Sequence, residues 1–388
     1  MDVINVKSVY EELKKNRARM GTVIRAVRRG DLDGFTPPST LVGEYNYPSV
    51  SVGVMFTLDE NAQIYDSPKH WAENGYDIAK ILSLRSLLIN GKESINVKRP
   101  DARTMENITM ATLSEREVQI SMDVSGLPPA PLYRNDTAGG LDVRIRGFRL
   151  NENVRMGRTV EKVYYDRDLK AADGILVLYN DKVDESKISR ILSVGAMGSK
   201  RKLVPTKWSI TAVDDILGKT LEERVKSLHR SEQYFVKTGS FLGNRFTFIF
   251  LKGPWSFELV EAWNRDGAAI FCGDSDYEFY SGRKTYAKNT AGAYYAIKLA
   301  VLEKLESLGQ QCSVIVIREI TPEYFAPLGV WVVREGARIA LSGDVERFDV
   351  LESAIDKAGQ HIIYLKNLDT KSRLLHYERT QRGLSSFY

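Results

Sequence analysis

The sequence has few of the residue types that build common cofactor sites. Its 388 residues include two cysteines, Cys272 and Cys312, and four histidines, with no C-x-x-C or H-x-x-x-H spacing among them. A zinc site needs several such ligands at short intervals, so we expect no zinc. The loops G-x-x-x-x-G-K-[ST] and G-x-G-x-x-G are also missing, which excludes the common nucleotide-binding fingerprints.

Long apolar runs and a strong charge imbalance are missing as well. No stretch approaches the length of about 18 apolar residues that a membrane helix needs, and the N-terminus has an early acid and no apolar segment. We therefore expect a cytoplasmic protein without a membrane span. The net charge is +5, from 55 basic and 50 acidic residues, which does not by itself indicate a nucleic-acid partner.

The periodicity of apolar residues predicts an α+β fold, with mixed or antiparallel sheets and packed helices. Helices are expected over residues 6–29, 77–90, 187–196, 290–308 and 346–358. Strands are expected over 50–57, 117–122, 141–150, 174–180, 244–251, 255–261, 312–318 and 329–334. The strands on either side of Lys252-Gly253-Pro254 are expected to form a hairpin. Residues 31–50, rich in proline, glycine and tyrosine, are predicted to form an ordered loop.

Three basic segments could contact nucleic acid. Residues 14–29 hold seven cations and no acid, arginines alternate with apolar residues over 141–150, and lysines surround a tryptophan within 198–215. Such residues can bind phosphates and stack on bases. The candidates are Arg25, Arg28, Arg29, Arg144, Arg146, Lys200, Arg201, Lys202, Lys207 and Trp208. A solvated helix face, the wet face of a sheet and a turn beside a buried tryptophan remain as alternatives.

Acidic residues offer a candidate catalytic site. Asp274, Asp276 and Glu278 stand at alternate positions, so on a strand they would share one face. Mg²⁺ or Mn²⁺ would neutralise such a cluster, as in metal-dependent nucleases. Asp214 is a candidate acid for a pocket that captures an extruded base. The aromatic residues of that pocket would be Tyr45, Tyr47, Trp208, Tyr294 and Tyr295. A turn with exposed acids and the N-terminus of a helix are the structural alternatives.

The last eight residues, 381–388, have the spacing Q-x-x-L-x-x-F-Y. It resembles the peptide through which many replication and repair proteins bind the sliding clamp PCNA. One helical turn would place Leu384, Phe387 and Tyr388 on one side as an apolar plug, while Gln381 offers its amide to a polar pocket. We therefore expect these four residues to bind a clamp, although the segment could instead pack on its own domain.

Several longer segments resemble one family, the archaeal Nre proteins, which are associated with the repair of DNA damage. Together with the C-terminal peptide, these segments are 37–53, 204–215, 289–305 and 316–335. The resemblance implies a larger N-terminal region over 1–265 that interacts with DNA, a smaller region over 266–378 and a flexible clamp-binding peptide over 379–388. Some members begin with a four-cysteine module that is missing here, so contact with DNA would use other surfaces.

The resemblance brings no established reaction, and two functions of different classes follow from it. The first is a DNA repair protein that PCNA recruits to DNA and that has no reaction of its own. The second is a metal-dependent nuclease, or another DNA-processing enzyme, that the same peptide recruits. A metabolic enzyme with an accidental C-terminal motif is a weaker third alternative, and it would not bind a clamp.

Overall fold

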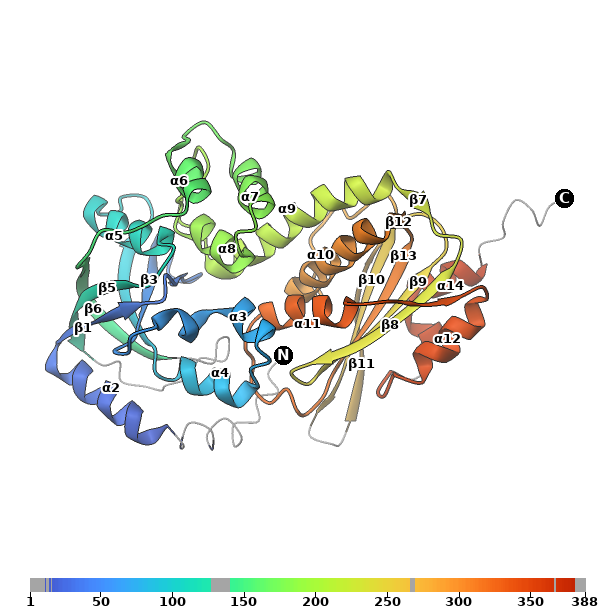
Figure 1. Cartoon of the computed structure of the whole chain (residues 1–388), viewed down its shortest axis with the longest axis horizontal. Coiled ribbons are helices and arrows are strands. Elements are labelled where there is room, and N and C mark those ends of the chain that lie inside the picture. Colours follow the sequence, from blue (N-terminus) through green and yellow to red (C-terminus); the bar gives the residue numbers. More distant parts are fainter. Residues whose placement is uncertain are drawn as a thin grey trace. The chain divides into compact units, whose positions relative to one another are not determined.

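The computed structural model describes residues 11, 14, 16–126, 140–265, 269–365 and 368–380. They form an α+β fold, as the sequence predicts, with two compact units (Figure 1). Unit 1 comprises Met1–Ile216 and Phe325–Gly329, and unit 2 comprises Leu217–Tyr324 and Val330–Tyr388. Helix α9 (Thr206–Lys226) begins in unit 1 and ends in unit 2. The division at residue 265 that the resemblance implies stays a prediction.

Unit 1 is built on a six-stranded mixed sheet in the order β1-β5-β6-β4-β3-β2, in which only β4 and β6 pair in parallel. Its strands are β1 (Asp31–Thr36), β2 (Thr40–Val42), β3 (Ser49–Phe56), β4 (Ile89–Asn96), β5 (Val118–Gly126) and β6 (Leu141–Leu150). The loop predicted over 31–50 is wrong, because it contains β1 and β2. In β1, Leu32, Gly34 and Thr36 alternate inward, and this burial outweighs the turn-forming composition.

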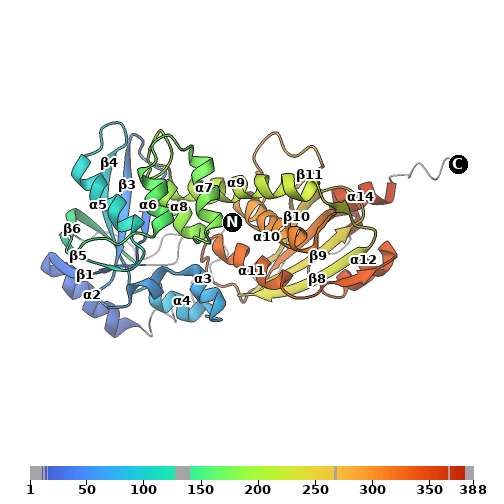
Figure 2. The ribbon, with the colours of Figure 1, turned by 45° about the horizontal axis from the view of Figure 1, so that its top comes forward.

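Helices surround this sheet, and α2 packs on β1 and β5 (Figure 2). They are α2 (Arg17–Arg29), the 3-10 helix η1 (Ala62–Asp66), α3 (Pro68–Glu73), α4 (Ile78–Arg85), α5 (Ala102–Leu113), α6 (Arg158–Tyr165), α7 (Ala171–Asn180) and α8 (Glu185–Ser193). The buried strand predicted over 174–180 is wrong, because these residues belong to α7. Gly174, Ile175 and Leu178 are buried as one face of that helix, and a short apolar run does not distinguish a strand from a buried helix.

A buried carboxylate joins several elements of unit 1. Asp66, at the end of η1, accepts hydrogen bonds from Arg190 of α8 (2.6 Å), Arg85 of α4 (3.2 Å) and the hydroxyl of Ser39 (2.5 Å). Arg85 also donates to the carbonyl oxygen of Leu328 (2.9 Å), in the short segment 325–329. Burial alone would raise the pKa of Asp66, but the two guanidinium groups outweigh it and lower this pKa below its usual value.

Unit 2 contains a second six-stranded sheet, in the order β11-β10-β13-β9-β8-β14. Its strands are β8 (Tyr234–Phe241), β9 (Asn244–Leu251), β10 (Ser256–Arg265), β11 (Ala269–Glu278), β13 (Ser313–Ile320) and β14 (Glu346–Phe348), and a separate small ladder joins β7 (His229–Arg230) to β12 (Gln310–Gln311). The hairpin predicted between β9 and β10 is wrong. Strand β13 lies between them, antiparallel to β9 and parallel to β10, and its run from Val314 to Ile317 is buried on both faces.

Helices cover both faces of the unit 2 sheet (Figure 1). They are α10 (Ala291–Leu308), α11 (Trp331–Leu341), α12 (Leu351–Gly359), α13 (Leu368–Lys371) and α14 (Arg373–Thr380). The strand predicted over 329–334 is wrong, because its apolar residues form the buried start of α11. No helix among the described residues is long and apolar enough to cross a membrane.

Two buried glutamates tie the C-terminal segment to the unit 2 sheet. Glu258 on β10 accepts hydrogen bonds from the hydroxyl of Ser372 (2.6 Å) and from the backbone N–H groups of Arg373 (2.9 Å) and Leu374 (3.0 Å). Glu319 on β13 accepts from the consecutive backbone N–H groups of residues 363–365. These side chains satisfy donors that would otherwise be buried without a partner. The chain is therefore held in place as far as α14.

We expect Asp66→Asn to destabilise the protein by about 3–5 kcal/mol, because Arg85 and Arg190 would stay buried without their carboxylate. Urea unfolding at pH 7 measures the loss. Asp59→Asn is the matched control, since Asp59 pairs with Arg19 at the surface (2.8 Å) and should change stability by less than about 1 kcal/mol. Equal losses in the two variants would contradict a special role for the buried pair.

The same substitution should remove a pH dependence. The pKa of Asp66 is lower in the folded protein than in the unfolded chain, so its contribution is fully present above the unfolded pKa. That contribution is lost as the pH falls through the folded pKa. The stability difference between wild type and Asp66→Asn should therefore be constant near neutral pH and shrink below about pH 4.

Candidate nucleic-acid interface

Strand β6 carries the predicted arginines, and a β-bulge decides which way they face. Asp123 of β5 pairs with Gly147 and Val124 pairs with Ile145, so Arg146 is an extra residue on β6. An extra residue shifts the alternation of side chains beyond it. Three apolar residues of β6 are therefore buried, and three arginines are exposed: Arg144, Arg146 and Arg149.

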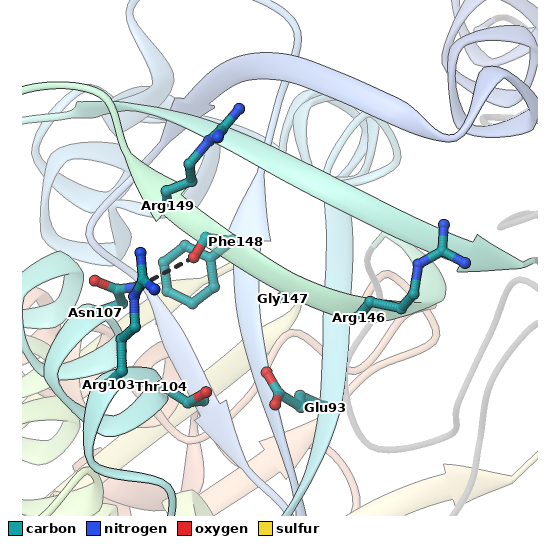
Figure 3. A pocket seen from close by; sticks show the side chains of 8 residues that line it. All are labelled: Glu93, Arg103, Thr104, Asn107, Arg146, Gly147, Phe148 and Arg149. Carbon is teal, nitrogen blue, oxygen red and sulfur yellow. Dashed lines mark hydrogen bonds between the residues drawn. The ribbon is translucent and has the colours of Figure 1, made fainter.

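A pocket of about 250 Å³ lies beside this bulge (Figure 3). Its walls come from β4, α5 and β6, and the lining residues are Glu93, Arg103, Thr104, Asn107, Arg146, Gly147, Phe148 and Arg149. The carboxylate of Asp101 accepts a hydrogen bond from the backbone N–H of Thr104 (2.8 Å) and so caps the start of α5. Asn107 donates to the carbonyl oxygen of Phe148 (3.0 Å), which fixes α5 against β6 (Figure 3).

Two arginines of the pocket, Arg146 and Arg149, differ in their partners. Arg146 forms a two-pronged ion pair with Asp123 (2.9 and 2.8 Å), so its charge is partly neutralised. Within the described part of the chain, the side chain of Arg149 makes no hydrogen bond or ion pair. Figure 3 shows Arg146 and Arg149 projecting from the same side of β6, away from Phe148. Planar guanidinium donors are well matched to phosphate oxygens, so this surface can hold a phosphate group of a nucleic-acid backbone.

One carboxylate, Glu93, also lines the pocket, and Figure 3 shows it on the side of Thr104, away from the guanidinium groups of Arg146 and Arg149. Burial and the neighbouring Asp101 raise the pKa of Glu93 above its ordinary value, and a hydrogen bond with Thr104 opposes them. Its Oε2 atom has no hydrogen-bond partner among the residues that the structure describes.

A second group of candidates meets at the start of α9. Thr206 accepts a hydrogen bond from the backbone N–H of Val42 (2.8 Å), and Lys207 lies 3.8 Å from Glu44. These contacts bring the β2–β3 turn beside the first turn of α9. The aromatic residues of the two turns are exposed, and they are Tyr45, Tyr47 and Trp208. The alternative in which Trp208 is buried in the core beside a lysine-rich turn is therefore wrong.

The remaining members of the predicted base pocket are elsewhere. Tyr294 and Tyr295 are buried inside unit 2, where Tyr294 packs against Phe257 with 5.0 Å between ring centroids. Asp214 is buried in α9. Residues enclosed in this way cannot line an open pocket for an extruded base. The base-capture site with all five aromatic residues is therefore wrong.

The other basic candidates divide into exposed and enclosed residues. On α2, the exposed side carries Arg25, Arg28 and Arg29, while Val23 and Val27 are buried. Lys200 and Lys202 are exposed as well. Arg201 differs, since its guanidinium donates to the carbonyl oxygens of residues 164, 166 and 196, so it supports the fold of unit 1.

The acidic residues of β11 share one face, as predicted, but two of them have structural partners. Asp276 accepts hydrogen bonds from the backbone N–H groups of Asn289 and Thr290 (both 2.8 Å) and thereby orders the start of α10. Glu278 pairs with Lys298 (2.5 Å). Among the described residues, no group of three or more His, Cys, Asp or Glu side chains is arranged to hold a metal ion. The role of Asp274, Asp276 and Glu278 with Mg²⁺ or Mn²⁺ stays a prediction without such a geometry.

Comparison with known proteins agrees with the resemblance seen in the sequence. A family model described as "Archaeal Nre, N-terminal" matches residues 7–268, and one described as "Archaeal Nre, C-terminal" matches 278–387. The chain belongs to the archaeal Nre family. It is 35% identical over 373 residues to DNA repair protein NreB of Archaeoglobus fulgidus, covering 92% of both chains. It is 33% identical over 366 residues to DNA repair protein NreA of Haloferax volcanii, covering 90% of this chain and 87% of that protein.

No solved structure matches this Nre protein. The arginine pocket and the exposed aromatic residues both fall within the N-terminal Nre region. Three charged residues of the pocket are not among the predicted site residues, namely Glu93, Arg103 and Arg149. Arg149 carried a usable signal, since it continues the arginine pattern of β6. Glu93 and Arg103 gave none, because their place in the pocket depends on the pairing of distant elements.

Gly147 offers a test of the pocket. A side chain there would meet nothing within 4 Å, so Gly147→Glu adds a negative charge to the pocket without a clash. A charge-assisted hydrogen bond contributes about 1.5–3 kcal/mol, so we expect about a tenfold or greater loss of affinity for duplex DNA at low salt. Fluorescence anisotropy with a labelled duplex measures it.

Gly157→Glu is the matched control for this experiment. Gly157 lies in unit 1 just before α6, and a side chain there also meets nothing within 4 Å. The two variants have the same net charge, so only Gly147→Glu should weaken binding strongly. If both variants lose the same affinity for duplex DNA, the cause is the change in net charge and not a contact in the pocket.

The contacts of Asp276 predict the result of removing it. In a buffer with EDTA, Asp276→Ala should destabilise the protein by at least about 1–3 kcal/mol, because buried N–H groups before α10 lose their acceptor and Arg283 loses its ion-pair partner (2.9 Å). A carboxylate of an empty metal site would behave in the opposite way, since its removal relieves repulsion. Asp274→Ala is the control on the same strand face, with a small expected effect. Urea unfolding distinguishes these outcomes.

Proposed function

We propose that this Nre protein is a DNA repair protein that PCNA recruits to DNA through residues 381–388. Its relatives are named DNA repair proteins, which supports the role in repair. The single observation that carries the clamp contact is the spacing of Gln381, Leu384, Phe387 and Tyr388. These residues lie outside the described part of the chain, so the clamp contact rests on their sequence.

The chemistry of the peptide suits a closed apolar pocket with a polar rim. Leu384 and the pair Phe387–Tyr388 would supply most of the affinity, because buried aromatic anchors dominate small interfaces. Gln381 has both a donor and an acceptor for the rim. A short helical turn brings the three apolar side chains to one side, which is a common way for a peptide to dock in a groove.

Helix α14, which directly precedes residues 381–388, is fixed to unit 2, and this supports the proposed clamp contact. Helix α14 is held by the buried Leu374 and Leu375 and by the carboxylate of Glu258, and it ends at Thr380. The four residue-to-residue steps from Thr380 to Leu384 can span at most about 14 Å. A clamp bound to Leu384 would therefore stay close to unit 2, without a long linker.

Recruitment also reduces the affinity that the DNA contact itself needs. A protein held at the clamp experiences DNA at a high effective concentration, so modest phosphate contacts suffice. The arginines of β6 and α2, and the lysines before α9, would supply such contacts. Such contacts are made to the phosphate backbone of the DNA. The affinity therefore falls as the salt concentration rises, and it varies little with the base sequence.

The double variant Phe387→Ala/Tyr388→Ala should lose clamp binding, by at least about a hundredfold if each ring contributes about 2 kcal/mol. Titration calorimetry with the PCNA of the same organism measures it. The melting temperature should not change. Ser385→Ala/Ser386→Ala alters the same peptide without removing an apolar side chain, and it should bind like wild type. Undiminished binding by the aromatic variant would place the clamp contact elsewhere.

A further inference from the structure

Three large aromatic side chains are exposed together on unit 1. The exposed fractions are 62% for Tyr45, 70% for Tyr47 and 59% for Trp208. The hydrogen bond from Val42 to Thr206 and the contact of Lys207 with Glu44 hold the two turns side by side. We refer to Tyr45, Tyr47 and Trp208 as the aromatic platform. Exposed aromatic groups of this size usually mark a binding surface.

The platform is built on ordered backbone. In the β2–β3 turn, the N–H of Gly43 donates to the carbonyl oxygen of Ser51 (2.7 Å), and the N–H of Ser49 donates to that of Asn46 (2.8 Å). Asn46 adopts the left-handed conformation (φ 65°), which asparagine tolerates at a turn. Trp208 stands on the first turn of α9, the helix that begins at Thr206. The backbone that carries the rings therefore needs little ordering when a ligand binds.

The charges around the platform favour an anionic ligand. Residues 43–48 and 199–208 contain four cations and one acid, Glu44. Arg201 is used inside the fold, which leaves Lys200, Lys202 and Lys207 on the surface. Lysines beside aromatic rings can hold the phosphates of a strand whose bases lie on the rings.

Aromatic side chains dominate the exposed hydrophobic surface of unit 1. Among the described residues of unit 1, the large hydrophobic residues that are exposed are all aromatic: Tyr45, Tyr47, Tyr165 and Trp208. Aromatic side chains are also common in protein interfaces, so the lysines beside the rings are what favours a nucleic acid. A flat aromatic face matches the face of a nucleobase.

We infer that the aromatic platform binds unpaired DNA bases by stacking. The inference rests on the proposed contact with DNA and adds its substrate class. In a continuous duplex, the face of every base is covered by its neighbours, so the rings have nothing to stack on. Single strands, gaps and frayed ends leave bases uncovered. The arginine pocket of β6 takes backbone phosphate from any DNA, and the platform selects the unpaired strand.

Trp208 provides a direct measurement. Of the five tryptophans, Trp71, Trp255 and Trp331 are buried, Trp263 is half-buried and Trp208 is exposed, so the part of the quenching that Trp208→Ala removes reports on Trp208. Titration with oligo(dT) should quench this fluorescence, and titration with a blunt duplex of equal length should quench it much less. Trp208→Ala and Tyr47→Ala should each lower the affinity for oligo(dT) by about tenfold or more. Anisotropy with a labelled duplex should change by less than about twofold.

Two further variants test stacking against simple apolar contact. Trp208→Phe keeps an aromatic face and should retain most of the affinity for oligo(dT), whereas Trp208→Leu should lose it. Tyr286→Ala is the matched control, because Tyr286 is 56% exposed on unit 2. Full affinity in Trp208→Leu would overturn the inference. Loss of clamp binding in Trp208→Ala with unchanged oligo(dT) affinity would also overturn it, and would assign the platform to a protein partner.

The wild-type protein separates this inference from the proposed function. Binding to duplex DNA without any preference for oligo(dT), and without quenching of Trp208, would overturn the platform alone. Failure to bind either DNA at low salt would overturn the DNA contact of the proposed function together with the platform. Clamp binding by residues 381–388 is measured separately, so it stands or falls on its own result.

Discussion

A buried carboxylate that collects hydrogen bonds organises each unit of the protein. In unit 1, Asp66 joins η1, α4 and α8 through two guanidinium groups. In unit 2, Glu258 and Glu319 serve the backbone of the segment that leads into α14. A buried charge is costly unless its partners stay in place, so each carboxylate constrains the position of every element that contacts it. The elements that form the surface of each unit are therefore positioned by these buried hydrogen bonds.

The two units use their sheets differently. In unit 2, helices cover both faces of the sheet. Its buried carboxylates accept hydrogen bonds from backbone N–H groups or form ion pairs with lysines. In unit 1, strand β6 leaves one face open and presents arginines there, and the turn after β2 presents aromatic rings. Under the proposed function, unit 1 would offer the surfaces for DNA, and unit 2 would supply a fixed base for the peptide of residues 381–388.

Features that depend on local sequence were predictable. The α10 helix, with Gly309 after its last residue, and the apolar strand β13 were predicted nearly to their ends. Short apolar runs were not, since residues 174–180 and 329–334 are compatible with either a strand or a buried helix. The insertion of β13 between β9 and β10 and the bulge at Arg146 arise from pairing between distant residues. The exposure of Trp208 depends on such distant contacts as well, so the local sequence does not decide it.

Residues 325–329 belong to unit 1, although the chain has by then built much of unit 2. The carbonyl oxygen of Leu328 receives a hydrogen bond from Arg85, which is buried beside Asp66. Domains generally fold as they leave the ribosome, the N-terminal one first. Here the N-terminal unit stays incomplete until residue 329 has emerged. Synthesis therefore imposes an overlapping order on the two units, in which unit 1 closes only after most strands of unit 2 are available.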